Sequence, residues 1–268
     1  MGIRLTVFTT SIITGVIFFF LFAGISFASY KQAYDDYHNE YSAYRQAYQD
    51  FIVASSTYNT YKTLLTQNTA MEKMRVVLIK RDLVVSAYFQ AVIEKMRETE
   101  GFSADSLNTF SGIVAAETAY LNDHQREINS AANIEDLNKV SGDFDDKYKT
   151  IEEEMKKAIG SILLAKIDLQ AAKVDDLSAR VNDTLTGLQN NGHDVLSWQR
   201  GLITARGKID LYQTKRDAAQ EVFSPQNSYY SNQEISLMSG QKFLAEGQQY
   251  LHEAGNFLLE IMNSLING

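Results

Sequence analysis

The amino-acid sequence predicts an all-α protein: an elongated bundle of about six long helices with coiled-coil-like packing, after an apolar N-terminal segment. Three observations favour this fold. The 268 residues include a single proline, a residue that breaks helix interiors. Apolar residues recur every three or four positions, which is the helical period. Glycines and capping residues separate the periodic segments.

Composition limits the chemistry open to this chain. The absence of cysteine excludes disulfides, thiolate metal sites and cysteine nucleophiles. The net charge is −8 and no long basic run occurs. Because phosphate binding needs clustered lysine and arginine, nucleic acid is not an expected partner. The length is sufficient for one or two domains with a sizeable core.

The N-terminal residues 5–29 carry no charge and directly follow Arg4. Their length suits a membrane-spanning helix, which needs about 20 apolar residues. Two interpretations remain open: a single-pass anchor with the N-terminus inside, or a signal peptide cleaved after Ala28, with secretion of the rest. The anchor is favoured because the apolar run is long for a signal peptide. The membrane is then a partner through residues 5–29.

Both interpretations give the same division of the chain. Residues 1–29 form a signal anchor or signal peptide, and residues 30–268 form an extracytoplasmic helical bundle. No later segment is long enough to span a membrane; the best candidate, residues 83–93, is short and flanked by charges.

Helix starts are predicted from capping residues. Thr69–Glu72 and Ser231–Glu234 fit the capping box, in which a hydroxyl and a carboxylate bind free N–H groups at a helix start. Asn133 is a further predicted N-cap.

Helix ends are predicted at Gly101, at Gly192 and at Ser224-Pro225, because glycine and proline commonly stop helices. The starts and stops together define the expected helices. These span residues 30–66, 70–100, 104–131, 134–190, 193–223 and 231–266.

A stripe of aromatic residues opens the first predicted helix, with alternating steps of four and three residues. It consists of Tyr30, Tyr34, Tyr37, Tyr41, Tyr44, Tyr48 and Phe51. Helical geometry places all seven on one face. The favoured interpretation is an internal seam, since tyrosine buries apolar area and keeps its hydroxyl at the solvent edge. The alternatives are an interaction face for a partner protein and a platform for a flat ligand such as a glycan.

A second seam lies in the last predicted helix, where leucine alternates with glycine or alanine at heptad spacing. It consists of Leu237, Gly240, Leu244, Gly247, Leu251 and Ala254. Glycine inside a helix costs about 1 kcal/mol relative to alanine, so two at this spacing suggest a packing role. A tight antiparallel hairpin with the preceding helix is favoured over an intermolecular zipper.

Motifs for catalysis and metal binding are weak in this sequence. The four histidines are widely separated and none belongs to an HExxH motif. Asp143–Asp146 lacks the central glycine and closing glutamate of a calcium loop, and an exposed acidic patch is expected there. Ser239–Lys242 matches Ser-x-x-Lys without the accompanying Lys-Thr-Gly element. No enzymatic activity, metal or cofactor is therefore expected.

The function predicted from the sequence is that of a membrane-anchored scaffold or protein-interaction module at the cell envelope. A protein partner or self-association is expected. Two alternatives remain open: a secreted helical effector of the pore-forming kind, and a solute-sensing or solute-binding helical bundle.

Overall fold

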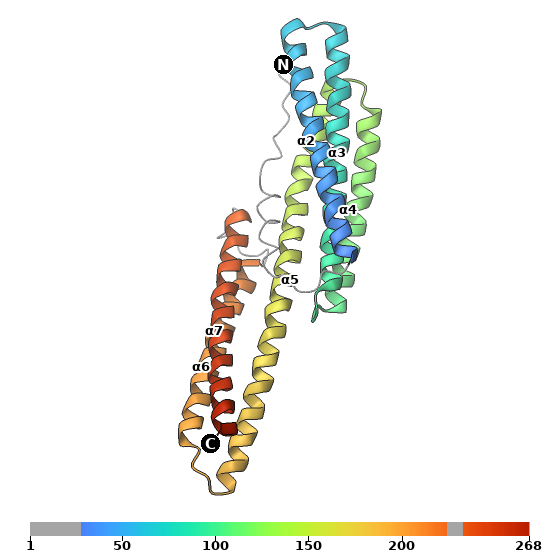
Figure 1. Ribbon diagram of the computed structural model, residues 1–268. Helices are drawn as coiled ribbons and strands as arrows, with labels where there is room; N and C mark the ends of the chain where they lie inside the picture. The colour runs from blue at the N-terminus through green and yellow to red at the C-terminus, as the bar shows by residue number, and fades with distance from the viewer. Residues whose placement is uncertain (1–27, 224–232, 268) are drawn as a thin grey trace. The chain divides into compact units, whose positions relative to one another are not determined.

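The computed structural model describes residues 28–223 and 233–267, and these form six α-helices that pack as a bundle (Figure 1). This confirms the predicted all-α fold. The helices are α2 (Ala28–Tyr61), α3 (Leu64–Glu98), α4 (Ala104–Ser130), α5 (Ile134–Asn190), α6 (Leu196–Phe223) and α7 (Gln233–Asn267).

Several predicted features lie outside the described residues. They include residues 1–27, which hold nearly all of the expected anchor or signal peptide, the Ser224-Pro225 stop, and Ser231 of the second capping box. Across the described ranges, no helix has an apolar stretch sufficient to cross a membrane.

The helix boundaries follow from local chemistry at three predicted positions. Asn133 caps α5, because its Oδ1 accepts a hydrogen bond from the N–H of Asp136 at 2.9 Å. Gly101 and Gly192 have φ values of +81° and +86°, in the left-handed region that glycine adopts most easily. After α5, the N–H of His193 also donates to the Leu188 carbonyl (3.1 Å), as in a Schellman ending. These three predictions are confirmed.

The predicted capping box at Thr69–Glu72 is wrong. Thr69 lies inside α3, where its hydroxyl donates to the Leu65 carbonyl (3.0 Å). The chain turns earlier, at Lys62 (φ +50°) and Thr63. There the Thr63 hydroxyl accepts from the N–H of Thr66 (3.2 Å), and the Thr66 hydroxyl accepts from the N–H of Thr63 (3.1 Å). Two threonines thus make the reciprocal bonds that a threonine and a glutamate make in the usual box.

The described chain divides into two compact units. The first unit contains residues 28–98 and 103–158, and the second contains residues 99–102 and everything described from Ile159 onward. The helix α5 contributes residues to both units.

In the first unit, α2 and α3 form an antiparallel hairpin, α4 packs against α3, and the first part of α5 completes the core (Figure 1). Its fully buried side chains include Phe51, Met74, Leu78, Ile128 and Leu137.

In the second unit, α6 and α7 form an antiparallel hairpin that packs on the rest of α5 (Figure 1). Two apolar clusters hold these helices together. They are centred on Ala205, Ala254 and Leu258, and on Tyr212, Ala219 and Phe223.

Candidate functional site

The predicted tyrosine stripe lies along the side of α2 that packs on the core of the first unit. Tyr37, Tyr44 and Phe51 are buried, with exposed fractions of 2%, 6% and 2%. The remaining four members of the stripe are half-buried; they are Tyr30, Tyr34, Tyr41 and Tyr48. The stripe therefore has a buried side, which is part of the core, and an edge that solvent reaches.

The rings of the stripe form a continuous ladder along α2. Each pair of successive tyrosines from Tyr30 to Tyr48 has ring centroids between 5.9 and 6.5 Å apart. The Tyr37 ring also lies 5.3 Å from that of Tyr88 on α3. Burial raises the pKa of Tyr37, and it raises that of Tyr44 to about 12. These two phenols are thus neutral at physiological pH, and the buried side of the ladder packs them as uncharged groups.

The accessible edge of this ladder is a second helical stripe, one position away from the buried one. We call it the tyrosine edge; it consists of Tyr34, His38, Tyr41, Arg45, Tyr48 and Ile52, in steps of four and three. His38 and Arg45 are exposed, and Ile52 is 43% exposed. The non-tyrosine members were not predicted from the sequence, because aromatic spacing alone does not include them.

Two members of the tyrosine edge show how it is built. The His38 ring lies against that of Tyr34, with centroids 4.5 Å apart and an edge-to-face angle of 76°. Arg45 has no ion-pair partner within the described part of the chain, although many lysines and arginines here do have one.

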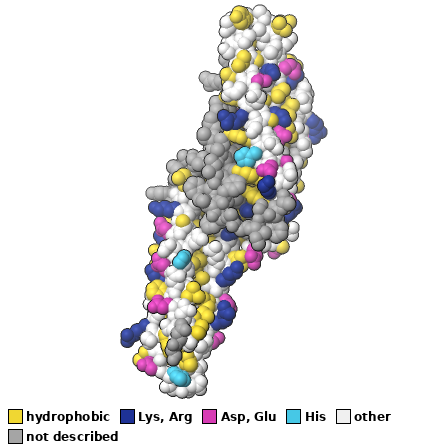
Figure 2. All heavy atoms as spheres, viewed as in Figure 1, with side chains coloured by type: hydrophobic (Ala, Val, Ile, Leu, Met, Phe, Trp, Pro, Cys, Tyr) yellow, Lys and Arg dark blue, Asp and Glu magenta, His cyan; other side chains and the backbone are white. Residues whose placement is uncertain are grey.

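Ion pairs link the two helices of each hairpin. Figure 2 shows basic and acidic side chains interspersed on the face drawn there. The short N–O distances of these pairs help to fix the register of the paired helices. The pairs are Lys73–Asp50 (3.0 Å) and Lys80–Glu40 (3.1 Å) between α2 and α3, and Lys208–Glu253 and Lys215–Glu246 (both 2.6 Å) between α6 and α7.

The predicted leucine–glycine seam lies inside the α6–α7 hairpin. Leu244 and Leu251 are buried in the cluster that joins α7 to α6 and α5. A Cβ on Gly247 would lie 3.3 Å from Tyr212 of α6. Ala254, fully buried, belongs to the neighbouring cluster, and Leu237 is half-buried at the other end.

Gly240 and Gly160 both face the ring of Phe223. A Cβ on Gly240 would come within 3.0 Å of three atoms of that side chain, and a Cβ on Gly160 within 2.8 Å of three. Real Cβ atoms do not approach other atoms so closely, so both positions exclude a side chain. Phe223, which ends α6, is thus held between glycines of α5 and α7, and the spacing of the predicted seam has a steric cause.

A buried acid–histidine pair lies in the first unit. The Nδ1 of His124 (α4) is 2.8 Å from Oδ2 of Asp82 (α3), and its Nε2 is 3.1 Å from the carbonyl oxygen of Val140 (α5). Both side chains are buried, and burial raises the pKa of Asp82. The Val140 carbonyl can only accept, so Nε2 carries a hydrogen, and one further proton bridges Nδ1 and Oδ2. The pair ties three helices together.

Arg81, next to Asp82, is also buried. Its guanidinium contacts Asp145 (3.3 Å) and Ser141 (3.4 Å), and it lies 3.7 Å from the centroid of the Phe144 ring. Asp145 was expected in an exposed acidic patch, and this expectation is wrong for that residue, since it is half-buried and pairs with a core arginine. An adjacent arginine and aspartate in a helix rich in valine and leucine were the sequence signal for this cluster.

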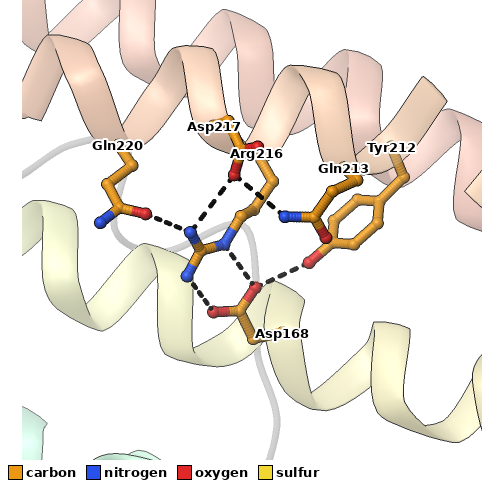
Figure 3. Close-up of polar contacts among 6 residues, drawn as sticks. All are labelled: Asp168, Tyr212, Gln213, Arg216, Asp217 and Gln220. Atoms are coloured by element: carbon orange, nitrogen blue, oxygen red, sulfur yellow. Dashed lines mark hydrogen bonds and ion pairs between the residues drawn. The ribbon is translucent and has the colours of Figure 1, made fainter. Parts of the chain in front are cut away.

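In the second unit, a cluster of polar side chains joins α5 to α6 (Figure 3). Arg216 binds Asp168 through two bonds, Nε to Oδ1 at 3.1 Å and Nη2 to Oδ2 at 3.0 Å. The Tyr212 hydroxyl donates to the same carboxylate at 2.7 Å. Asp217 and Gln220 contact the other side of the guanidinium. Arginine fits a carboxylate in this two-bond geometry, so the cluster fixes the position of α6 on α5.

These polar clusters connect helices to one another. Among the described residues, no three histidine, aspartate or glutamate side chains gather in an arrangement that could hold a metal ion. No protein-family model matches the chain, and no curated protein or solved structure shows significant similarity to it.

Proposed function

We propose that this chain is a membrane-anchored, extracytoplasmic scaffold that binds a helix of a partner protein along the tyrosine edge of α2. The anchor part of the proposal is supported by the uncharged residues 5–29. The binding part depends on one observation: a row of half-buried tyrosine rings beside the exposed side chains of His38 and Arg45. The proposed role is non-enzymatic.

The spacing of the tyrosine edge suits a helical partner. Steps of four and three residues keep the same face of α2 toward a neighbouring helix over several turns. Helix-binding surfaces of this kind are recognised by anchors at matching spacing on the partner. The tyrosine edge covers five such steps, from Tyr34 to Ile52.

The residue types of this edge are also those that dominate binding energies. Tyrosine and arginine are enriched among the residues whose truncation weakens interfaces most. The rings are already fixed by the ladder, so binding orders few further side chains. The charge of Arg45, unpaired within the described residues, predicts an acidic side chain opposite it on the partner.

The test is the size of the native complex extracted from cells in mild detergent. The variant Arg45→Glu combined with His38→Glu changes two exposed residues and leaves the buried side of the ladder intact. We expect the wild-type chain to migrate in a larger complex and this variant to migrate alone. The matched control is Arg126→Glu, which alters an arginine on α4 whose side chain is 79% exposed.

Two results would contradict the proposal. One is a wild-type chain that migrates alone, and the other is a control variant that loses the complex as fully as the α2 variant does. If the complex has a mass that is a multiple of the chain's own mass, the partner helix belongs to a second copy.

A further inference from the structure

The turn between α2 and α3 carries large apolar side chains in contact with solvent. Tyr61, Leu64 and Leu65 are 68%, 72% and 76% exposed. They lie within four residues of one another around the turn at Lys62 and Thr63. Figure 2 shows apolar side chains at the end of the first unit where Figure 1 places this turn. We call Tyr61, Lys62, Leu64 and Leu65 the hairpin tip.

The charges around the hairpin tip differ from those of the whole chain. The chain has 33 acidic residues and a net charge of −8, yet between Asp50 and Glu72 the only charged residue is Lys62. The two acids that border this region are each paired, Asp50 with Lys73 at 3.0 Å and Glu72 with Arg75 at 3.0 Å. The hairpin tip is therefore an apolar, weakly basic end on an acidic protein.

Several backbone groups of the turn have hydrogen-bond partners within the turn. The N–H of Lys62 donates to the Tyr58 carbonyl at 2.8 Å. The N–H groups of Thr63 and Thr66 donate to each other's hydroxyls, and the Thr66 hydroxyl also donates to the Thr63 carbonyl at 3.0 Å. Moving a polar backbone group out of water without a hydrogen-bond partner costs on the order of 2–7 kcal/mol of free energy. These bonds lower the free-energy cost of moving the turn out of water.

We propose that the hairpin tip inserts into the interface of a phospholipid bilayer. Tyrosine prefers the headgroup level, leucine prefers the acyl boundary, and a lysine between them places its ammonium among lipid phosphates. Interfacial segments enter by about 5–10 Å, which corresponds to one or two helical turns at this tip. The lack of acidic residues removes the repulsion that an anionic membrane surface would exert.

A lipid surface fits the hairpin tip better than a protein groove does. Leu64 and Leu65 are adjacent on α3, so their side chains leave the helix about 100° apart, and Tyr61 leaves from the other helix. A groove in a protein covers one face of a helix. Apolar side chains that point in several directions around one turn require a medium that surrounds them. This contact is separate from the proposed anchor in residues 5–29 and from the tyrosine edge.

The chain's lack of cysteine allows a local test. In the full-length chain, Leu65→Cys is labelled with a polarity-sensitive fluorophore, and the protein is reconstituted into vesicles of phosphatidylcholine and phosphatidylglycerol. Further vesicles of the same composition are then added. We expect a blue shift, a several-fold gain in intensity, and quenching by lipids labelled near the headgroup. The matched control is the same label at Ile203→Cys, a similarly exposed aliphatic position (68%) on α6, which should remain in a water-like environment.

A second comparison tests which residues carry the insertion. Tyr61→Ser with Leu64→Ser should abolish the blue shift of the label at position 65, while Ile203→Ser should leave it unchanged. All three replaced side chains are more than two-thirds exposed, so thermal unfolding should be the same in all proteins. The proposal is overturned if the label at position 65 remains in a water-like environment both before and after the further vesicles are added. This holds even when residues 5–29 keep the protein in the membrane fraction. That result would instead indicate that the hairpin tip binds a protein partner.

Discussion

The side chain of Phe223 fills the space that a side chain at Gly240 would occupy. A Cβ on this glycine would come within 3.0 Å of three ring atoms. The contact joins the end of α6 to α7 at a residue of the predicted leucine–glycine seam. A Cβ on Gly160 of α5 would meet other atoms of the same side chain, namely Cβ, Cγ and Cδ2.

We expect Gly240→Ala to lower the free energy of unfolding of the second unit by about 1–3 kcal/mol, the usual cost of overpacking a filled core. The measurement is denaturant unfolding followed by the fluorescence of Trp198. This is the only tryptophan of the chain and packs against a core cluster of the second unit, so its signal reports on that unit.

The control for this prediction is Gly255→Ala in the same helix. No atom lies within 4 Å of the position that its Cβ would take, so alanine should stabilise α7 by up to about 1 kcal/mol. Equal effects of the two substitutions would show that helix propensity, and not the contact with Phe223, decides the outcome at position 240.

The pair of Asp82 and His124 predicts a pH dependence of the first unit. Burial raises the pKa of Asp82, and a group whose pKa is raised by folding stabilises the folded state at low pH and loses this contribution as pH rises. In the unfolded chain an exposed aspartate loses its proton above about pH 3.9. The contribution of Asp82 to the free energy of unfolding should therefore fall by up to about 1.4 kcal/mol per pH unit as the pH rises from about 4 toward the raised pKa of the folded carboxyl.

The variant Asp82→Asn isolates this effect. An asparagine amide can donate to Nδ1 of neutral His124 without a bridging proton, so the bond remains and its titration is removed. The measurement is urea unfolding followed by near-ultraviolet circular dichroism, to which the tyrosines of the first unit contribute most. Parallel pH profiles for the two proteins would rule out the shared proton.

The two-bond ion pair between Arg216 and Asp168 should contribute measurably to the stability of the second unit. We expect Asp168→Asn to lower the free energy of unfolding by about 1–2 kcal/mol, less than a fully buried charged bond because Asp168 is partly exposed. The loss should shrink at high salt. The control is Asp217→Asn, which alters the same cluster at a side chain that is 61% exposed and should cost less than about 0.5 kcal/mol. Trp198 fluorescence again reports the result, and a larger loss at Asp217 would contradict it.

The threonine turn predicts a difference between two similar substitutions. Thr63→Ala removes the hydroxyl that caps α3 and should cost about 1 kcal/mol in the first unit. Thr69→Ala removes a hydroxyl that binds the carbonyl of its own helix and should cost little or even stabilise, since alanine is the better helix former. Both are read from the tyrosine circular dichroism during urea unfolding. The reverse order would restore the capping box at Thr69.

The fate of the N-terminus is tested by the N-terminal sequence and intact mass of the protein from fractionated cells. We expect a chain that begins at Met1 and stays in the membrane pellet after an alkaline wash, because an uncharged segment of this length favours the bilayer over water. A chain that begins at Ser29 and appears in soluble extracytoplasmic material would replace the anchor by a cleaved signal peptide.

The sequence predicted the helices well because their signals are local. Asn133, Gly101 and Gly192 act through their own backbone and immediate neighbours, so their roles follow from residue type and spacing. The turn at Lys62 and Thr63 was missed for the opposite reason. A run rich in threonine offers several hydroxyls as caps, and only the fold selects which one faces a free N–H.

The contacts between helices could not be predicted in the same way. Asp82 and His124 are 42 residues apart, and nothing in either helix indicates the other as its partner. The glycine seam was an intermediate case: its spacing indicated close packing, but Phe223 as the residue that requires it emerged only from the structure. The tyrosine edge likewise depends on which side of α2 the core covers.

The position of His124 between three helices has a consequence for the kinetics of folding. Its two ring nitrogens meet partners from α3 and α5, so its full set of bonds forms only when α3, α4 and α5 have assembled. We expect this set to form in a late docking step of the first unit, after the transition state of folding. A rise in pH past the raised pKa of Asp82 should accordingly accelerate unfolding and leave the refolding rate almost unchanged.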